Sequence, residues 1–217
     1  MVAMTVDPAT LRQAYEGGRL DEADLAGSWH EQLAAWFEAA AADPDVLEPN
    51  AIQLATVDPT GRPSVRTVLA KRIDERGIVF YTNYDSAKAR DLAAQPRAAA
   101  VFVWLAHHRQ VRLEGTVAKV SRAETAAYFA TRPHESQVGA WASPQSQVIE
   151  SRAALDALAA DAEQRLGDGP IEPPPHWGGY LLTPDRVEFW QGRVGRLHDR
   201  LRFRRDGDDW LIERLAP

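Results

Sequence analysis

The middle of the chain alternates short segments of strand-like composition with tight turn sequences. This alternation limits the possible folds more than any other feature of the sequence. Residues 58–61 and 74–77 each begin with Asp and end with Gly, as β-turns commonly do. The segments with the composition of strands are residues 51–57, 64–73, 78–82, 98–105 and 110–120. Because connections this short join antiparallel neighbours, the sequence predicts an antiparallel sheet.

Helical segments flank this region. Ser28-x-x-Glu31 and Ser121-x-x-Glu124 are capping boxes, and each precedes a stretch with an apolar face. The predicted helices are residues 8–16, 28–42, 86–94, 121–132 and 153–166. After a proline-rich connector, strands are predicted over residues 179–182, 187–191, 197–205 and 210–215.

The order of these elements indicates the fold class. About seven strands with helices between them, mostly joined by short turns, favour a mainly β chain of the α+β class whose antiparallel sheet closes as a barrel. The alternation of strand and helix that a Rossmann fold needs is missing. We expect a helical segment over residues 1–45 that packs on the barrel, and a single barrel domain over residues 46–217.

Composition excludes several classes of function. The chain has no cysteine, so disulfide scaffolds, thiolate metal sites and thiol nucleophiles are ruled out. A net charge of −6 argues against a general electrostatic grip on nucleic acid, so any anion site must be local. No apolar run approaches the ~20 residues that cross a bilayer. Nothing at the N-terminus resembles a secretory signal, and we expect a cytoplasmic protein without a membrane partner.

Some motifs fail on inspection. Gly192-x-x-Gly195 lacks the third glycine and the strand–helix context of a dinucleotide loop. The histidines show no metal-ligand spacing, and His107 and His108 are best read as polar residues in a turn. We therefore expect no metal centre.

A basic stripe near the C-terminus is more informative. Strand alternation would place Arg196, His198, Arg200, Arg202 and Arg204 on one face, where like charges repel unless an anion or carboxylates lie nearby. Carboxylate partners are the favoured explanation for Arg202 and Arg204. An anionic ligand is favoured for Arg196 and His198, which follow a Gly-flanked loop.

A second basic group follows residues 66–71 and includes Lys88. Arg66 and Lys71 are an odd number of residues apart, so a flat strand would place them on opposite faces. Either a bulge intervenes or the two cations serve different parts of one ligand. A phosphate ligand and edge lysines that suppress aggregation both remain open here.

The third element consists of aromatic and amide side chains. Core packing explains most of the tryptophans, including Trp36 and Trp210. The aromatic and polar side chains that could instead flank a planar heterocycle are Gln110, Trp141, Gln145, Ser146, Trp177, Trp190 and Gln191. Together with the basic groups, they favour a flat, phosphorylated, aromatic cofactor.

Several motifs together resemble the pyridoxamine/pyridoxine 5′-phosphate oxidase family. They are Arg66-Thr67-Val68-Leu69-Ala70-Lys71, Val79-Phe80-Tyr81-Thr82-Asn83, Arg132-Pro133-x-x-Ser136-Gln137-x-Gly139-Ala140-Trp141, Trp177-Gly178-Gly179, Glu188-Phe189-Trp190-Gln191-Gly192, Arg196-Leu197-His198-Asp199-Arg200 and Arg214-Leu215-Ala216-Pro217. The resemblance runs from about Leu11 to the last residue with compatible spacing, and the last two motifs distinguish it from other flavin-binding split barrels.

The resemblance implies an FMN-binding split β-barrel and a homodimer with its flavin sites at the subunit interface. It implies oxidation of pyridoxine or pyridoxamine 5′-phosphate by O₂ to pyridoxal 5′-phosphate and H₂O₂. The implied FMN contacts are Arg66, Thr67, Val68, Leu69, Ala70, Lys71, Tyr81, Thr82, Lys88, Gln110, Gln145, Ser146, Trp190 and Arg200. The implied substrate contacts are Arg12, Tyr15, Lys71, Tyr128, Arg132, Ser136, Arg196, Leu197 and His198, with Arg196 and His198 as the catalytic pair.

One departure and three alternatives accompany this resemblance. The family often has Ser-Arg-Lys where this chain has Ser86-Ala87-Lys88, so one arginine for the flavin phosphate is missing. A split-barrel reductase that uses a deazaflavin, a phenazine-pathway oxidase and a non-catalytic flavin- or pyridoxal-phosphate-binding protein are the alternatives. The motif over residues 196–200 argues against the first of these, and more weakly against the second.

Overall fold

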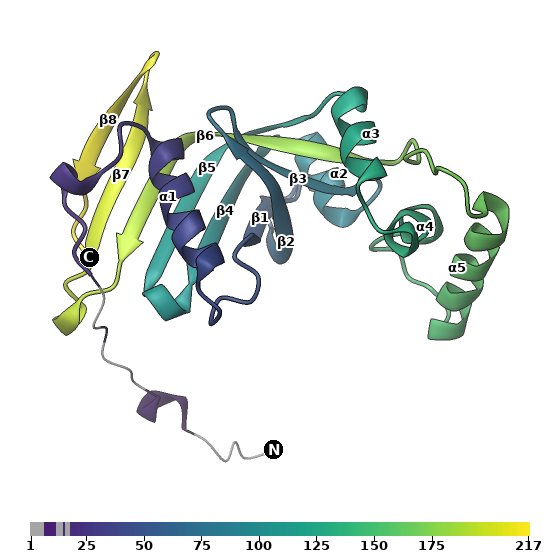
Figure 1. Ribbon diagram of the computed structural model, residues 1–217, viewed down its shortest axis with the longest axis horizontal. Helices are drawn as coiled ribbons and strands as arrows, with labels where there is room; N and C mark the ends of the chain where they lie inside the picture. The colour runs from purple at the N-terminus through teal and green to yellow at the C-terminus, as the bar shows by residue number, and fades with distance from the viewer. Residues whose placement is uncertain (1–6, 12–14, 16–17) are drawn as a thin grey trace.

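The architecture is an eight-stranded antiparallel sheet whose first six strands close on themselves (Figure 1). The computed structural model describes residues 7–11, 15 and 18–217. The strands are β1 Ala51–Val57, β2 Pro63–Asp74, β3 Gly77–Asn83, β4 Arg97–Trp104, β5 Arg109–Lys119, β6 Trp177–Gln191, β7 Asp199–Asp206 and β8 Asp209–Arg214. Their order in the sheet is β3-β2-β1-β4-β5-β6-β7-β8, and a further pairing of β3 with β6 closes the barrel. The predicted antiparallel barrel is confirmed.

Strand β6 holds the barrel and its extension together. Its first half, from Trp177 to Leu182, pairs with β3, and its second half, from Arg186 to Gln191, pairs with β7. The sequence predicts two separate strands here, and this is wrong. Pro184 is accommodated at a register shift opposite Gly115, where an added Cβ would lie 2.0 Å from the Thr183 carbonyl oxygen. The missing side chain of Gly115 therefore lets the two strands stay paired through the irregularity.

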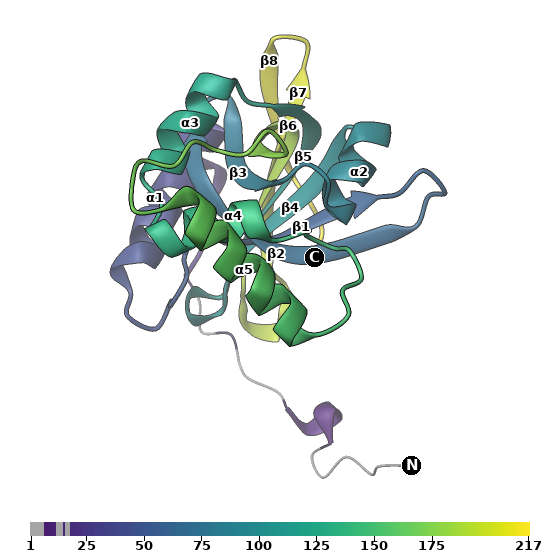
Figure 2. The same cartoon turned by 90° about the vertical axis from the view of Figure 1, so that its right-hand side faces the viewer.

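The helices lie around the barrel. They are α1 Trp29–Ala42, α2 Ala87–Ala94, α3 Arg122–Ala130, α4 His134–Ala142 and α5 Arg152–Leu166. Figure 2 shows α4 and α5 in front of the barrel with α3 above them, at the end of the molecule away from β7 and β8. The Ser28 and Ser121 side chains accept hydrogen bonds from the N–H groups of Glu31 and Glu124, as the capping motifs predict.

Two helical predictions are corrected. Helix α4 is absent from the sequence prediction because Pro133 reads as the end of the preceding helix, whereas it is the N-cap of the next one. Near the N-terminus, Pro8–Thr10 forms a single turn of 3₁₀ helix, and neither Leu11 nor Tyr15 is helical. The rest of the predicted first helix lies outside the described residues.

The barrel interior is the main hydrophobic core. Alternate residues of β1 point inward, and Ile52 and Leu54 are fully buried. Trp36 of α1 packs edge-on against Phe189 at 5.3 Å between ring centroids, as expected for a core tryptophan. A second cluster around Phe129 and Trp177 joins α3, α4 and α5 to the barrel. Among the described residues, no helix has both the length and the apolar character to cross a membrane.

Candidate active site

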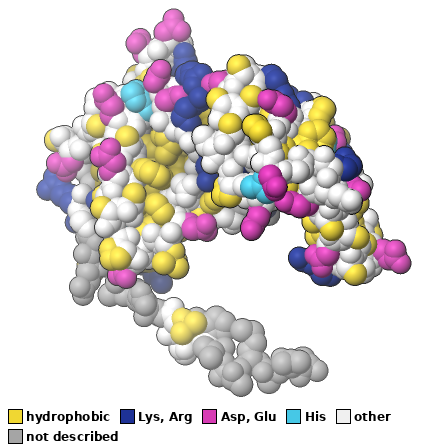
Figure 3. All heavy atoms as spheres, turned by 45° about the vertical axis from the view of Figure 1, so that its right-hand side comes forward, with side chains coloured by type: hydrophobic (Ala, Val, Ile, Leu, Met, Phe, Trp, Pro, Cys, Tyr) yellow, Lys and Arg dark blue, Asp and Glu magenta, His cyan; other side chains and the backbone are white. Residues whose placement is uncertain are grey.

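A cleft of about 690 Å³ opens between strands β2 and β3 and helices α2, α3 and α4. Its lining residues are Arg66, Thr67, Val68, Leu69, Lys71, Tyr81, Thr82, Lys88, Tyr128, Thr131, Arg132, Pro133, Ser136, Gln145 and Trp177. Most residues that the resemblance assigns to flavin and to the substrate phosphate therefore meet in one place. Charged side chains of both signs are interspersed on the face drawn in Figure 3, so the concentration of cations in the cleft is a local property.

A bulge in β2 explains how residues of both parities face the cleft. The pairing of β2 with β3 shifts register between Ala70 and Arg72, which leaves Lys71 as the extra residue. Arg66 and Lys71 thus both line the cleft despite their odd spacing. The sequence left a bulge and a divided role open, and the structure shows the bulge.

Lys88 is the most deeply placed cation of the cleft, with 8% of its surface exposed. Its Nζ atom donates to Gln145 Oε1 at 2.8 Å, to Thr82 Oγ1 at 3.0 Å and to Ser86 Oγ at 3.3 Å. Burial, with a smaller contribution from the positive charge of Arg66, lowers the pKa of Lys88 to about 8. All three partners are neutral, so the ammonium charge is not compensated by them.

Arg66 is held on the outer side of the same cleft. Its guanidinium donates to Thr56 Oγ1 at 2.6 Å and to Ser64 Oγ at 2.7 Å, and Asp91 lies 3.8 Å away. Burial lowers the pKa of Arg66, and Asp91 partly offsets this. Asp91 supplies one negative charge beside the two positive charges of Arg66 and Lys88. The net charge of this part of the cleft is therefore positive, which favours binding of an anion.

A second cationic corner is built on aromatic rings. The Arg132 guanidinium carbon lies 4.6 Å from the centre of the Trp177 ring, and burial lowers the pKa of Arg132. Its Nη1 atom is buried and has no hydrogen-bond partner among the described residues. A buried guanidinium N–H without an acceptor costs free energy, so this corner also favours an anion. Ser136 lies in the first turn of α4 and Tyr128 near the end of α3, and both line the cleft beside Arg132.

The residues around the loop that follows β6 form a separate group. Tyr15 lies edge-on against His198 at 5.5 Å and against Trp190 at 5.9 Å between ring centroids. The backbone N–H of Arg193 donates to His198 Nδ1 at 3.1 Å. In the neutral ring this leaves the proton on Nε2. Burial, and after it the charge of Arg196, lowers the pKa of His198, which favours that neutral form.

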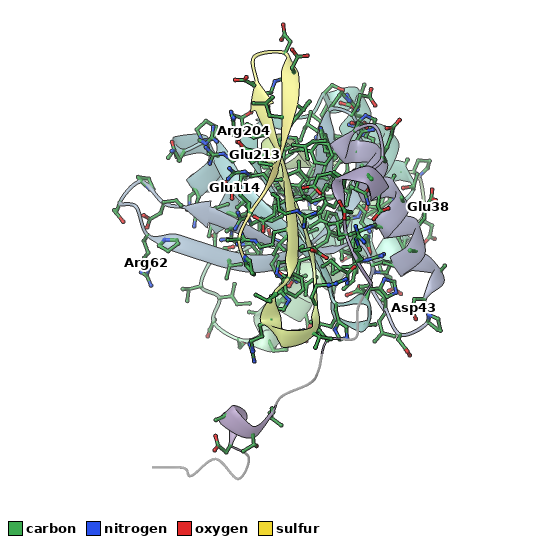
Figure 4. All side chains as sticks on the ribbon, turned by 90° about the vertical axis from the view of Figure 1, so that its left-hand side faces the viewer. Glu38, Asp43, Arg62, Glu114, Arg204 and Glu213 are labelled. Atoms are coloured by element: carbon green, nitrogen blue, oxygen red, sulfur yellow. The ribbon has the colours of Figure 1, made fainter. Side chains whose placement is uncertain are left out.

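The predicted basic face of the C-terminal strand is partly wrong. Strand β7 begins at Asp199, so Arg196 and His198 precede it, and Arg196 ends a 3₁₀ turn with a φ of 63°. Positive φ is uncommon for a residue other than glycine and often marks a functional position. Arg202 and Arg204 do lie on the strand and pair with Glu213 of β8 at 2.6 and 3.1 Å, which confirms the expected carboxylate partner; Arg204 and Glu213 are labelled in Figure 4.

Arg200 also has a partner within the chain. Its guanidinium bonds Glu188 at 2.7 Å and the Ala216 carbonyl at 2.8 Å, and Glu188 raises the pKa of Arg200. Arg200 pairs across the sheet with Trp190, which in turn pairs with Gln110, so these three implied flavin contacts are neighbours. They lie away from the lining of the cleft.

The implied site residues thus fall into two groups that do not meet within one chain. The cleft lies beside α3 and α4, whereas the loop after β6 lies at the opposite end of the molecule in Figure 1. Ala70 is buried and Ser146 is exposed with a φ of 70°, and neither lines the cleft. Leu197 is 73% exposed on the distant loop. Arg12 lies outside the described residues.

Sequence reasoning missed two residues of the cleft, Thr131 and Pro133. Both belong to the connection between α3 and α4, so recognising Pro133 as the start of a helix would have found them. Trp177, which the sequence suggests as a flank for a flat ligand, lines the cleft and also lies against Arg132. In the turn at His107, the Nε2 atom of His107 lies 2.6 Å from the carboxylate of Asp43, a hydrogen bond in keeping with a polar turn residue.

Comparison with known proteins agrees with this arrangement. Residues 28–165 match the family model described as pyridoxamine 5′-phosphate oxidase, and residues 177–217 match the pyridoxine 5′-phosphate oxidase C-terminal dimerisation region. The pyridoxine/pyridoxamine 5′-phosphate oxidase of Saccharopolyspora erythraea is 57% identical over 96% of this chain and 94% of its own length. The protein of the same name from Burkholderia lata is 54% identical over 96% of this chain and 98% of its own length.

Solved structures show the same fold. PhzG from Burkholderia lata, crystallised with tetrahydrophenazine-1-carboxylic acid, superposes with a TM-score of 0.87 at 31% identity, covering 94% of this chain and all of that one. A pyridoxamine 5′-phosphate oxidase-related, FMN-binding protein from Nostoc punctiforme superposes with a TM-score of 0.71 at 22% identity, covering 89% of this chain. The matched models and the close relatives together span nearly the whole chain, and the protein belongs to the pyridoxamine 5′-phosphate oxidase family.

Proposed function

We propose that this protein is an FMN-dependent oxidase that converts pyridoxamine or pyridoxine 5′-phosphate with O₂ to pyridoxal 5′-phosphate and H₂O₂, with water consumed and ammonia released when the substrate is the amine. The observation that carries the proposal is a single cleft with two independently built cationic corners. Arg66 and Lys88 form one corner, and Lys71 and Arg132 contribute to the other. Two anionic groups in one cleft suit a phosphorylated cofactor beside a phosphorylated substrate.

The first corner fits the phosphate of FMN. Lys88 is a buried cation and Arg66 a half-buried one, with Asp91 as a nearby carboxylate, and Gln145 and Thr82 supply neutral polar atoms. Backbone groups of residues 67–69 lie along the wall of the same cleft. A phosphate would stabilise both charges through hydrogen bonds that water reaches poorly at this depth. When bound there, FMN supplies the group that accepts a hydride from the substrate.

The second corner fits the phosphate of the substrate. Arg132 offers an unpaired buried N–H group, and Ser136 and Tyr128 offer hydroxyls beside it. Lys71 projects from the β2 bulge into the same space. These four side chains would hold the phosphate and so orient the ring of the substrate toward the flavin.

A homodimer supplies the remaining residues. Arg196 and His198 lie on a loop far from the cleft of their own chain, within the segment that matches the dimerisation region. In a two-fold dimer, the loop of each chain would reach the cleft of its partner, so the same contact would occur twice and complete both clefts. Arg196 would then orient the substrate at the carbon that loses the hydride, and His198 would donate a hydrogen bond from Nε2.

Oxidation of a phenazine precursor is the second candidate, because the PhzG structure superposes closely. The ligand in that structure is a carboxylic acid without a phosphate. The corner formed by Lys71, Arg132, Tyr128 and Ser136 would lack its natural partner with such a substrate. The phosphorylated vitamin is therefore the favoured substrate.

The experiment is an oxidation assay on purified protein reconstituted with FMN. Pyridoxamine 5′-phosphate, pyridoxine 5′-phosphate and tetrahydrophenazine-1-carboxylic acid are compared, with H₂O₂ release and aldehyde absorbance as readouts. We expect H₂O₂ and aldehyde with the two phosphates only. Turnover of the phenazine acid alone would establish the second candidate. Binding of FMN without turnover of any substrate would indicate a flavin carrier. Failure to take up FMN would contradict a flavin site altogether.

Arg196→Ala provides a further test within this assay. Removing a cation that contacts the anionic substrate is expected to lower kcat/KM by an amount equal to about 1.5–3 kcal/mol. Flavin content is expected to remain near that of the unmodified protein, since the cleft is unchanged. Loss of flavin with normal kinetics after reconstitution would show that Arg196 has been given the wrong role.

A further inference from the structure

Trp177 belongs to an aromatic block that forms part of the wall of the cleft. It begins strand β6 and is 6% exposed. Its ring lies nearly parallel to Tyr81, at 5.4 Å and 14°, and to Tyr128, at 6.3 Å and 7°. Tyr81 and Tyr128 stack on each other at 4.0 Å. The orientation of the Trp177 ring is therefore set by several neighbours.

The backbone around Trp177 also holds it in place. Its N–H donates to the Pro174 carbonyl at 3.0 Å, and its own carbonyl accepts from Arg122 at 2.9 Å. Gly179 pairs with Tyr81 across the sheet, and a Cβ there would lie 2.8 Å from the Tyr81 ring. The absence of that side chain lets the Tyr81 ring lie against the strand and continue the stack.

One face of the Trp177 indole supports Arg132. The guanidinium carbon lies 4.6 Å from the ring centre, a distance typical of a cation–π contact, and Phe129 lies on another side at 5.4 Å. The Nη1 atom has no hydrogen-bond partner among the described residues. Ring faces thus restrict the guanidinium, and its buried Nη1 atom keeps an unused hydrogen-bond capacity among the described residues.

We propose that Trp177 is a positioning residue that presents Arg132 to the phosphate of the substrate, an inference that rests on the proposed function. An arginine side chain loses rotamer freedom when it binds an anion, and a ring that already restricts it reduces this loss. The same block carries Tyr128, so one rigid unit presents both the guanidinium and a hydroxyl. Trp177 itself needs no contact with the substrate.

The kinetic test is a double-mutant cycle with Trp177→Leu and Arg132→Ala. In the unmodified background, Trp177→Leu is expected to lower kcat/KM for pyridoxamine 5′-phosphate by about tenfold, within the range of a desolvated cation–π contact. Most of this loss is expected in KM, because the phosphate lies away from the reacting atoms. In the Arg132→Ala background, the same change is expected to alter kcat/KM by less than about threefold. Equal factors in both backgrounds would overturn the proposal.

Two further variants separate positioning from a general loss of structure. Trp177→Phe keeps an aromatic face and is expected to recover most of the activity that Trp177→Leu loses. Trp210→Phe is the matched control, since the Trp210 ring lies on β8, 6.2 Å from the ring of Trp29, and away from the cleft. It is expected to leave KM unchanged. Failure of Trp177→Phe to recover activity, or a KM change in Trp210→Phe as large as in Trp177→Leu, would also count against the proposal.

A spectroscopic measurement makes the test independent of turnover. The Nε–H NMR signal of Arg132, identified by its loss in Arg132→Ala, is expected to be shifted upfield by the ring current of Trp177. The shift is expected to disappear in Trp177→Leu and to persist in part in Trp177→Phe. An unshifted signal in the unmodified protein would refute the positioning role even if the oxidase is active. A shifted signal in a protein that does not oxidise the vitamin would leave the contact intact and refute the proposed function instead.

Discussion

At the scale of single residues, Lys88 connects the ionisation of the cleft to cofactor binding. Its lowered pKa of about 8 means that the empty cleft holds a charged ammonium only below that pH. FMN affinity is therefore expected to fall as the pH rises above about 8, by at most about tenfold per pH unit. Fluorescence titration of apoprotein with FMN between pH 7 and pH 10 measures this. Lys88→Met is expected to bind FMN more weakly at pH 7 and to show little further decline; an identical decline in this variant would assign the titration to another group.

The same group affects stability with the opposite sign. A lysine whose pKa is lowered on folding destabilises the folded apoprotein while it is charged, so this cost is fully present below pH 8. The cost diminishes as the pH rises from about 8 toward the ordinary lysine pKa. The phosphate of FMN would compensate the buried charge of Lys88, whereas a high pH removes that charge by deprotonation.

Ala87 stands where the family resemblance implies an arginine beside Lys88. It is the first residue of α2, and the Ser86 N-cap makes no side-chain hydrogen bond to the helix, so N–H groups remain available to an anion. Ala87→Arg is expected to tighten FMN binding by about 1–2 kcal/mol, with little effect on turnover at saturating FMN. FMN titration at one ionic strength measures the effect. Ala94→Arg, at the exposed far end of the same helix, is the matched control for added charge, and equal tightening by both variants would contradict a specific contact.

His198 allows a test of which ring nitrogen acts. Since Nδ1 accepts from the Arg193 N–H, Nε2 is the donor that faces outward. Gln places an amide N–H near the position of Nε2, whereas Asn places one near Nδ1. His198→Gln is expected to keep kcat/KM within about tenfold, and His198→Asn to lose about a hundredfold, the scale of one buried donor to a developing charge. Steady-state kinetics over pH 6–9 measures both. Equal losses in the two variants would indicate proton transfer by the imidazole instead.

At the scale of elements, the irregularity between β5 and β6 is the most demanding contact of the barrel. A Cβ on Gly115 would lie 2.0 Å from the Thr183 carbonyl oxygen, and both residues belong to paired strands whose backbone cannot easily shift. Gly115→Ala is expected to destabilise the protein by about 2–4 kcal/mol, as overpacking against backbone does. Gly169→Ala, where nothing lies within 4 Å, is the control and is expected to change stability by less than about 0.5 kcal/mol. Urea unfolding of both variants measures this; similar midpoints would show that the strands separate at little cost.

At the scale of the whole molecule, the separation of the two site groups leads to a test of the dimer. Arg132→Ala removes a residue of the cleft, and Arg196→Ala removes a residue of the distant loop. If each site combines the cleft of one chain with the loop of its partner, a mixed dimer has one doubly altered site and one intact site. Refolding an equal mixture of the two inactive variants is then expected to restore about a quarter of the normal activity. No recovery, with mixed dimers shown to form, would place both groups in the same chain.

Dilution provides an independent check of the same arrangement. Loss of FMN is expected to coincide with dissociation to monomers, because half of each flavin site would leave with the partner. Analytical ultracentrifugation with detection at flavin and protein wavelengths measures both species. A flavin-loaded monomer would contradict a shared site.

The sequence by itself determined the local elements of this protein. Strand β1 and the capped start of α1 lie where alternation and the Ser28 motif predict them, because their signals come from neighbouring residues. The odd spacing of Arg66 and Lys71 raised a bulge as one of two alternatives, since the period of a strand is two, and only the pairing of β2 with β3 showed the bulge. The family motifs also brought most residues of the cleft into one prediction.

Only the tertiary structure decided what depends on contacts between distant segments. The continuity of β6 through Pro184 depends on Gly115, which lies 69 positions earlier in the chain. The charge of Arg200 is compensated by Glu188 of the neighbouring strand β6. The position of the Arg196 loop depends on how β6 leaves the barrel. The Trp177 ring faces Arg132 because α3 and β6 pack together. Periodicity shows which face of an element is apolar, whereas long-range packing decides what that face packs against. The same packing places the cations of the cleft and those of the Arg196 loop at opposite ends of the chain's fold.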